Sequence, residues 1–207
     1  MKTLLIGATG AVGSDLLELL LEDGEVESVV IFVRRNPGVE HPKLTVHVID
    51  FDKPEGWSHL VMGDVLFSCL GTTRKDAGSK AAQWKVDYDY QYSFAKAARQ
   101  NGVECYVLVS AMNASSKSLF FYSRIKGKLD EDVTNLGFPK LLIFKPPSLI
   151  RKESDRKMEK MGVKVIGFFN RLGLMKSLKP MSTDALAKKM LDDVRYHDKR
   201  SRNVQIK

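Results

Sequence analysis

Apolar residues along this chain gather in short continuous runs, and stretches with helical spacing separate those runs. The runs are rich in Val, Ile, Leu and Phe, which is typical of parallel strands that are buried on both faces. The pattern predicts strands at 2–6, 29–33, 44–49, 64–70, 105–110, 141–144 and 203–206. It also predicts four helices. The first begins at 14 and ends at a Gly24 cap, and the second spans 79–100. The third contains Tyr122 and ends near 136, and the fourth spans 184–197.

The alternation of strands and helices predicts an α/β fold, in which a doubly wound parallel sheet has helices on both faces. The length of 207 residues favours one domain over residues 1–207. In such a sheet, ligands bind at the carboxyl ends of the strands, near the point where the strand order reverses. Clusters of Gly, Arg, Asp, Thr, Ser and Pro follow the predicted strands, so we expect a ligand site at that edge.

The first predicted strand runs directly into three glycines, Gly7, Gly10 and Gly13, at the spacing G-x-x-G-x-x-G. Gly7 would let the chain turn sharply, Gly10 would let the backbone approach a phosphate, and Gly13 would let the helix pack on the strand. A pyrophosphate would then lie on the helix N-terminus, where free N–H groups favour negative charge. The alternative is an ordinary glycine-rich turn between a strand and a helix.

A basic pair, Arg34 and Arg35, ends the second predicted strand. An NAD site usually has Asp or Glu there, which binds the ribose 2′-hydroxyl, whereas a guanidinium suits a 2′-phosphate. The pair therefore favours NADPH over NADH as the cofactor. The alternative is a basic pair on the surface with no ligand.

Three further residues predict carbonyl chemistry. Tyr122 and Lys126 are separated by four positions and lie on one face of a predicted helix, and Ser110 ends the strand before it. A nearby Lys126 ammonium would lower the pKa of the Tyr122 phenol, which could then protonate a carbonyl oxygen as hydride arrives. Ser110 could donate a hydrogen bond to the same oxygen. The alternative is a packed tyrosine and a solvated lysine.

With these motifs the chain resembles the short-chain dehydrogenase/reductase superfamily. Residues 69–74, 77–78, 86–90, 122–127 and 144–147 resemble its atypical subgroup, typified by the human Tat-interacting oxidoreductase-like protein. The subgroup's tandem serines are Ser110 and Ala111 here, so one serine remains.

The resemblance implies a Rossmann-type domain that binds NADPH, with a small, mostly helical lobe at 151–200 on the substrate side. It implies Ser110, Tyr122 and Lys126 as catalytic residues. The predicted cofactor site comprises Gly7, Thr9, Gly10, Ala11, Val12, Gly13, Arg34, Arg35, Asp50, Phe51, Leu70, Gly71, Thr72, Lys126, Pro146 and Ser148.

The charge is concentrated near the C-terminus. Residues 1–150 contain 17 Lys and Arg against 18 Asp and Glu, while residues 151–207 contain 16 against 7. That basic quarter could attract an anion or nucleic acid, but it lacks the interleaved aromatic residues of a strand-binding groove, so we expect no specific nucleic-acid partner. The four histidines have no metal-ligand spacing, and no metal is expected.

Two cysteines, Cys69 and Cys105, lie inside apolar runs, which indicates buried thiols in a reducing environment. No apolar run is long enough to span a bilayer and no signal-peptide pattern is present, so we expect a cytoplasmic protein that is a monomer or homodimer.

Two functional hypotheses follow. The first is an NADPH-dependent oxidoreductase that reduces a small carbonyl compound, with Tyr122 as the general acid. The second is a non-catalytic sensor that binds NADP(H) and changes partners with its redox state. The presence of Ser110, Tyr122 and Lys126 together favours the enzyme, because a sensor has no need of the set.

Overall fold

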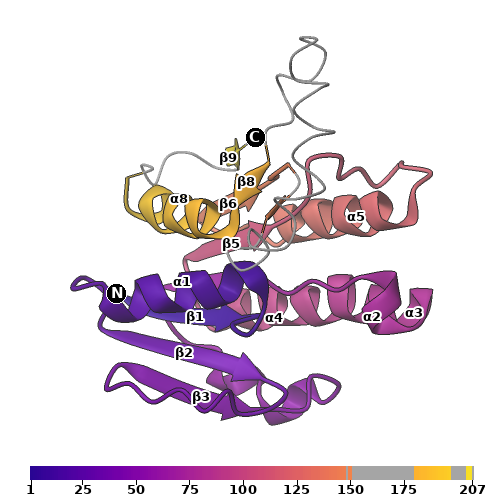
Figure 1. Ribbon diagram of the computed structural model, residues 1–207. Helices are drawn as coiled ribbons and strands as arrows, with labels where there is room; N and C mark the ends of the chain where they lie inside the picture. The colour runs from indigo at the N-terminus through magenta and orange to yellow at the C-terminus, as the bar shows by residue number, and fades with distance from the viewer. Residues whose placement is uncertain (148, 151–179, 197–203, 207) are drawn as a thin grey trace, which may run out of the picture.

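The computed structural model describes residues 1–147, 149–150, 180–196 and 204–206. Its centre is a seven-stranded parallel sheet (Figure 1). In spatial order the strands are β3 (Leu44–Val48), β2 (Ser28–Val33), β1 (Lys2–Ile6), β4 (Val65–Ser68), β5 (Cys105–Val109), β6 (Lys140–Phe144) and β9 (Val204–Ile206). The order reverses between β1 and β4, which places the expected ligand site at the ends of those two strands.

Helices cover both faces of the sheet, which confirms the predicted doubly wound fold (Figure 1). One face packs against α1 (Ala11–Glu22) and α8 (Thr183–Tyr196). The other packs against α4 (Tyr90–Gln100) and α5 (Phe121–Asn135). Shorter elements complete the description: η1 (Pro54–Gly56), η2 (Ser58–Leu60), α2 (Arg74–Ala77), α3 (Lys80–Trp84), η3 (Lys85–Asp89), β7 (Leu149–Ile150) and β8 (Met181–Ser182).

The helix expected over 79–100 is continuous but not uniform. Helices α3 and α4 are joined by η3, a segment with π-helical hydrogen bonding. The helix ends as predicted at Gly102, whose φ of 83° only glycine adopts readily. The predicted cap at Gly24 is wrong, because α1 ends at Glu22 and its C-cap is Asp23, in extended backbone. The spacing of apolar positions reveals neither the π-helical segment nor a helix whose C-cap is in extended backbone.

Helix α8 belongs to the layers of the sheet. Its buried residues Leu186, Ala187, Met190 and Leu191 join the core beneath α1, and Arg195 forms ion pairs with Asp23 and with Glu25. The described part of the predicted substrate lobe is therefore part of the Rossmann layer. Residues 151–179 and 197–200 of that lobe lie outside the described residues.

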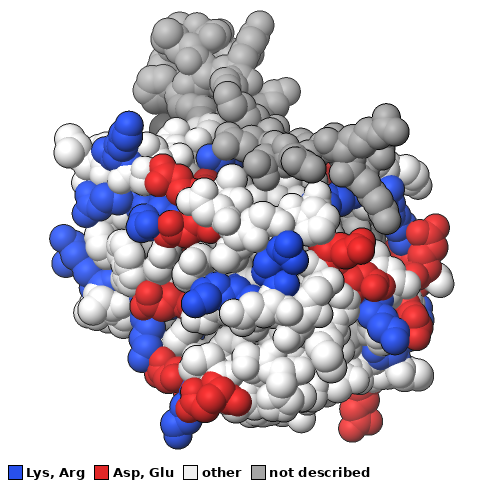
Figure 2. All heavy atoms as spheres, turned by 180° about the vertical axis from the view of Figure 1, so that it is seen from behind, with Lys and Arg blue, Asp and Glu red and all other residues white. Residues whose placement is uncertain are grey.

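Acidic and basic side chains are interspersed on the face that Figure 2 shows. This fits the near balance of charge over residues 1–150. Most of the basic quarter lies outside the described residues, so its predicted lack of specific nucleic-acid binding stays a prediction.

Candidate cofactor and catalytic site

The glycine turn after β1 is built as its sequence predicts for two of its three glycines. Gly7 has a φ of 85°, and a Cβ there would lie 2.5 Å from the carbonyl carbon of Cys69. A Cβ on Gly13 would lie 2.1 Å from the Gly7 carbonyl oxygen. Both positions therefore need glycine for packing within the protein, since real Cβ atoms do not approach so closely.

Gly10 is different, because the protein itself leaves room beside it. Its backbone is extended, with φ −86°, and a Cβ would meet only the Gly7 carbonyl oxygen at 3.2 Å and the Cys69 carbonyl oxygen at 3.9 Å. It is the N-cap of α1 and supplies no side-chain cap, so the first-turn N–H groups of Ala11, Val12 and Gly13 have no side-chain acceptor from the cap residue. These features fit a pyrophosphate, which would occupy the space of the missing side chain.

The loop after β4 borders the glycine turn. The Cys69 N–H donates to the Ile6 carbonyl at 2.9 Å, which brings the ends of β1 and β4 together. Leu70 packs against the core, while Gly71 is exposed and Thr72 is half-buried. This is the position, at the reversal of strand order, at which a dinucleotide binds in sheets of this type.

The basic pair lies at the carboxyl end of β2, as predicted. Arg34 and Arg35 are both exposed, and neither guanidinium pairs with an acidic group among the described residues. A 2′-phosphate at this strand end would meet donors that are not already occupied.

Other predicted cofactor residues are placed less favourably. The Phe51 side chain is buried against Tyr90 and Phe94, so its ring is part of the core. The Asp50 carboxylate accepts the Asp52 N–H at 3.0 Å and thus closes its own turn. Thr9 is exposed and Pro146 is buried. Ser148 lies outside the described residues.

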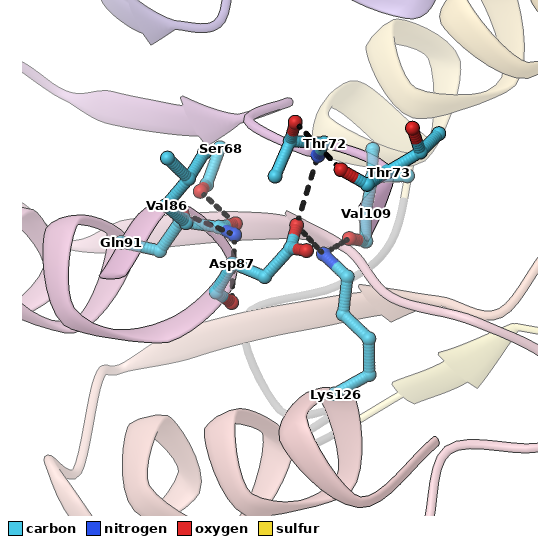
Figure 3. A network of polar contacts seen from close by, with 8 residues as sticks. All are labelled: Ser68, Thr72, Thr73, Val86, Asp87, Gln91, Val109 and Lys126. Atoms are coloured by element: carbon cyan, nitrogen blue, oxygen red, sulfur yellow. Dashed lines mark hydrogen bonds and ion pairs between the residues drawn. The ribbon is translucent and has the colours of Figure 1, made fainter. Parts of the chain in front are cut away.

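Lys126 is buried at the centre of a polar network (Figure 3). Its Nζ donates to the Val109 carbonyl at 3.3 Å, directly before Ser110, and lies 4.0 Å from Oδ1 of Asp87. The same Oδ1 accepts the Thr72 N–H at 3.1 Å. Burial lowers the pKa of the Lys126 ammonium, and Asp87 opposes that change. Burial raises the pKa of the Asp87 carboxyl, against the effect of Lys126.

Tyr122 lies one helical turn before Lys126, and 44% of its surface is exposed. Partial burial of the phenol and the negative charge of Asp87 raise its pKa to about 12. The expectation that Lys126 lowers this pKa is wrong, because the ammonium faces Asp87 and the Val109 carbonyl instead. Tyr122 therefore holds its proton at neutral pH in this arrangement.

Ser110 is buried at 4% exposure, and its hydroxyl has no well-formed hydrogen bond to another described residue. It neighbours Asp130, which lies 2.9 Å from the Lys145 ammonium. Burial raises the pKa of the Asp130 carboxyl, while Ser110 and Lys145 oppose that increase. A hollow of about 530 Å³ beside this pair is lined in part by Ser115 and Gly127.

Sequence reasoning missed Asp87, Asp130 and Lys145 as members of the site. A signal for Asp87 was present, because Gln83, Asp87 and Gln91 recur at every fourth position and form a polar stripe on a buried helix face. No comparable spacing marks Asp130 with Lys145, which come together only through the fold.

Metal and membrane features can be described for the same residues. The described residues contain no group of three or more His, Cys, Asp or Glu that could hold a metal ion. Among the described helices, none combines the length and apolar character that crossing a bilayer requires.

A glycine turn at the strand-order reversal of a parallel sheet defines a dinucleotide-binding protein of Rossmann type. The model of a family described as NAD(P)H-binding matches residues 7–140, and the chain belongs to that family. The glycine turn, from Gly7 to Gly13, lies at the start of the matched residues.

Fungal proteins named "Protein FMP52, mitochondrial" are similar over most of their length. The one from Meyerozyma guilliermondii is 41% identical over 171 residues, which cover 80% of this chain and 73% of that protein. The one from Candida albicans is 33% identical and covers 93% of this chain and 87% of that protein. The expected cytoplasmic location is wrong, because these relatives are named mitochondrial. Reduced thiols indicate a reducing environment and do not identify the compartment.

Solved structures share the fold. A short-chain dehydrogenase family protein from Francisella tularensis has a TM-score of 0.71 and 13% identity, over 99% of this chain and 95% of that one. A short-chain dehydrogenase/reductase superfamily protein from Agrobacterium tumefaciens, solved with bound NAD, has a TM-score of 0.71 and 14% identity, over 95% of this chain and 74% of that one. At such identities the likeness shows the fold alone.

Proposed function

We propose that this protein reduces a small carbonyl compound with NADPH, and that Tyr122 is the general acid. The observation that carries the proposal is the pairing of a half-exposed Tyr122 phenol with a buried, charge-partnered Lys126 one helical turn further on. Both residues lie on α5, the helix that follows β5. Their part of the helix lies near the carboxyl ends of the strands, where the glycine turn also lies. A bound nicotinamide supplies the hydride to the carbonyl carbon.

The protonated state of the Tyr122 phenol fits its proposed role as the general acid in reduction. When hydride reaches the carbonyl carbon, the electrons of the C=O π bond move to oxygen, which then needs a proton. A phenol with a pKa of about 12 is protonated at neutral pH and can donate that proton. The Ser110 hydroxyl is the proposed second donor to the same oxygen.

The guanidinium groups of Arg34 and Arg35 form no ion pair with any acidic group in the described part of the chain, which supports NADPH as the preferred cofactor. Gly7, Gly10 and Gly13 would hold the pyrophosphate against α1, and Gly71 with Thr72 would border it from the loop after β4. The names of the fungal relatives support a mitochondrial location for this protein as well.

A sensor that binds NADP(H) without turnover is the second candidate, and one observation favours it. The Ser110 side chain is 4% exposed and neighbours Asp130, so it is not open to a substrate in this arrangement. A sensor would keep the glycine turn and the basic pair but would not need an accessible serine.

The test measures NADPH binding and NADPH oxidation separately. Calorimetry gives the affinity, and absorbance at 340 nm follows oxidation in the presence of a panel of aldehydes, ketones and quinones. We expect tight binding and oxidation with at least one class of carbonyl. Tight binding without oxidation across the panel would replace the enzyme with the sensor, and absence of binding would contradict both.

A further inference from the structure

We infer that Asp87 is a positioning residue that holds the Lys126 ammonium at the end of β5 and fixes the loop after β4 against it. The inference rests on the proposed function and extends it to a residue outside the Ser110, Tyr122 and Lys126 set. Asp87 lies on η3, which packs beside α5, the helix that carries Lys126 (Figure 3). It therefore connects two elements that each contribute to the site.

One carboxylate oxygen makes both connections. Oδ1 of Asp87 accepts the Thr72 N–H at 3.1 Å and lies 4.0 Å from Nζ of Lys126. Both side chains of the pair are at most 3% exposed. In a site from which water is excluded, an ion pair is weakly screened, so the carboxylate strongly influences where the ammonium rests.

The helix is built to hold Asp87 in place. Gln91 donates through Nε2 to the Asp87 carbonyl at 3.0 Å and accepts the Ser68 hydroxyl at 2.8 Å (Figure 3). The network thus ties η3 to the end of β4. A π segment inside an α-helix is frequent at functional sites, because it redirects side chains at a small cost in backbone hydrogen bonds.

The titratable groups that face Lys126 come from three elements. Asp87 on η3 and Asp130 on α5 both favour its charged form, and Cys69 follows β4. The Cys69 thiol is buried, which raises its pKa to about 12 and keeps it neutral. Asp130 pairs with Lys145 at 2.9 Å, which leaves Asp87 as the carboxylate committed to Lys126.

Asp87→Asn removes the negative charge but nearly keeps the size of the side chain, and the amide oxygen can still accept the Thr72 N–H. We expect NADPH affinity to change less than about threefold and kcat to fall roughly 10- to 100-fold, as when an outer partner that orients a functional group is lost. Without the carboxylate, Lys126 should lose its proton at lower pH, and the alkaline limb of the kcat profile should move to lower pH. Glu18→Gln, an exposed change on α1, is the matched control.

A second readout does not depend on turnover. ¹⁵N NMR of the lysine Nζ groups, with Lys126 assigned from Lys126→Arg, follows its protonation in the protein without cofactor. We expect the Lys126 signal to titrate at lower pH in Asp87→Asn than in the wild type. An unchanged titration would overturn the role of Asp87 even if the enzyme is active, whereas a shift without any carbonyl reduction would overturn only the proposed function.

A double variant covers the case in which Asp87→Asn does not fold. Removing both charges, in Asp87→Asn with Lys126→Met, leaves no unpaired buried charge and should recover stability relative to the single variant. Urea unfolding measures this coupling. If the double variant loses as much free energy of unfolding as the two single variants lose together, the pairing is contradicted.

Discussion

Gly13 lies directly against Gly7, so a Cβ on Gly13 would come within 2.1 Å of the Gly7 carbonyl oxygen. Gly10, between them, has no such neighbour below 3.2 Å. The three glycines of one motif therefore serve different purposes. Two of them allow the chain to pack on itself, and the third leaves space for a ligand.

This difference predicts opposite behaviour for two variants. Gly13→Ala should lower the free energy of unfolding by at least about 1–3 kcal/mol, the usual cost of overpacking. Gly10→Val should leave the fold largely intact and abolish NADPH binding. Urea unfolding and an NADPH fluorescence titration measure the two effects. Normal binding by a folded Gly10→Val protein would show that the cofactor lies elsewhere.

The basic pair predicts cofactor preference. We expect NADPH to bind at least tenfold more tightly than NADH, because hydrogen bonds to a charged phosphate contribute about 1.5–3 kcal/mol. Replacing Arg34 and Arg35 together with Ala should remove most of this difference and leave NADH affinity nearly unchanged. Calorimetry with both cofactors is the measurement, and Lys188→Ala, an exposed change on α8, is the control. Equal affinities in the wild type would contradict the assignment.

Tyr122→Phe tests the general acid. The change keeps the ring and removes the proton donor, so kcat for a carbonyl substrate should fall by roughly 10²–10⁴-fold. NADPH affinity should hardly change, because the glycine turn and the basic pair hold the cofactor. Tyr196→Phe, at an 80% exposed tyrosine, is the matched control. Turnover at the wild-type rate would exclude Tyr122 as the acid.

The pKa of Tyr122 can be tested without a substrate. Burial and the Asp87 charge disfavour the phenolate and raise the pKa to about 12, so Tyr122 should remain protonated as the pH rises through 10. Absorbance at 295 nm, compared between the wild type and Tyr122→Phe, isolates this phenol. A Tyr122 phenolate that appears near pH 9 would mean that Lys126 acts on it directly after all.

Much of the fold could be predicted because its local and long-range signals agree. The apolar runs that became β1, β2, β4, β5 and β6 are continuous, as buried parallel strands require, and glycines end the helices at Gly102 and Gly137. The turn after β1 could be predicted equally well, because its glycine motif involves only one strand and the helix directly after it.

The electrostatics of the site could not be predicted from spacing. Tyr122 and Lys126 occupy one helix face, which favoured a direct effect of one on the other. The structure turns the ammonium toward Asp87, nearly forty positions earlier in the chain, and that partner is set by tertiary packing. The burial of the Phe51 ring could not be predicted for a similar reason, since a strand-end position does not reveal that a ring packs against Phe94.

The π segment at Lys85–Asp89 lets this region hold one residue more than a regular α-helix along the same path. The Gln91 side chain reaches back to it and donates to the carbonyls of Val86 and Asp87. A deletion of one residue inside the segment would remove the extra residue and leave a regular helix, with Phe94 and the buried alanines of α4 still facing the sheet. The same deletion within the regular turns of α4 would rotate everything after it by about 100°. The loss of one codon is therefore compatible with the packing of this helix only within the segment that holds Asp87.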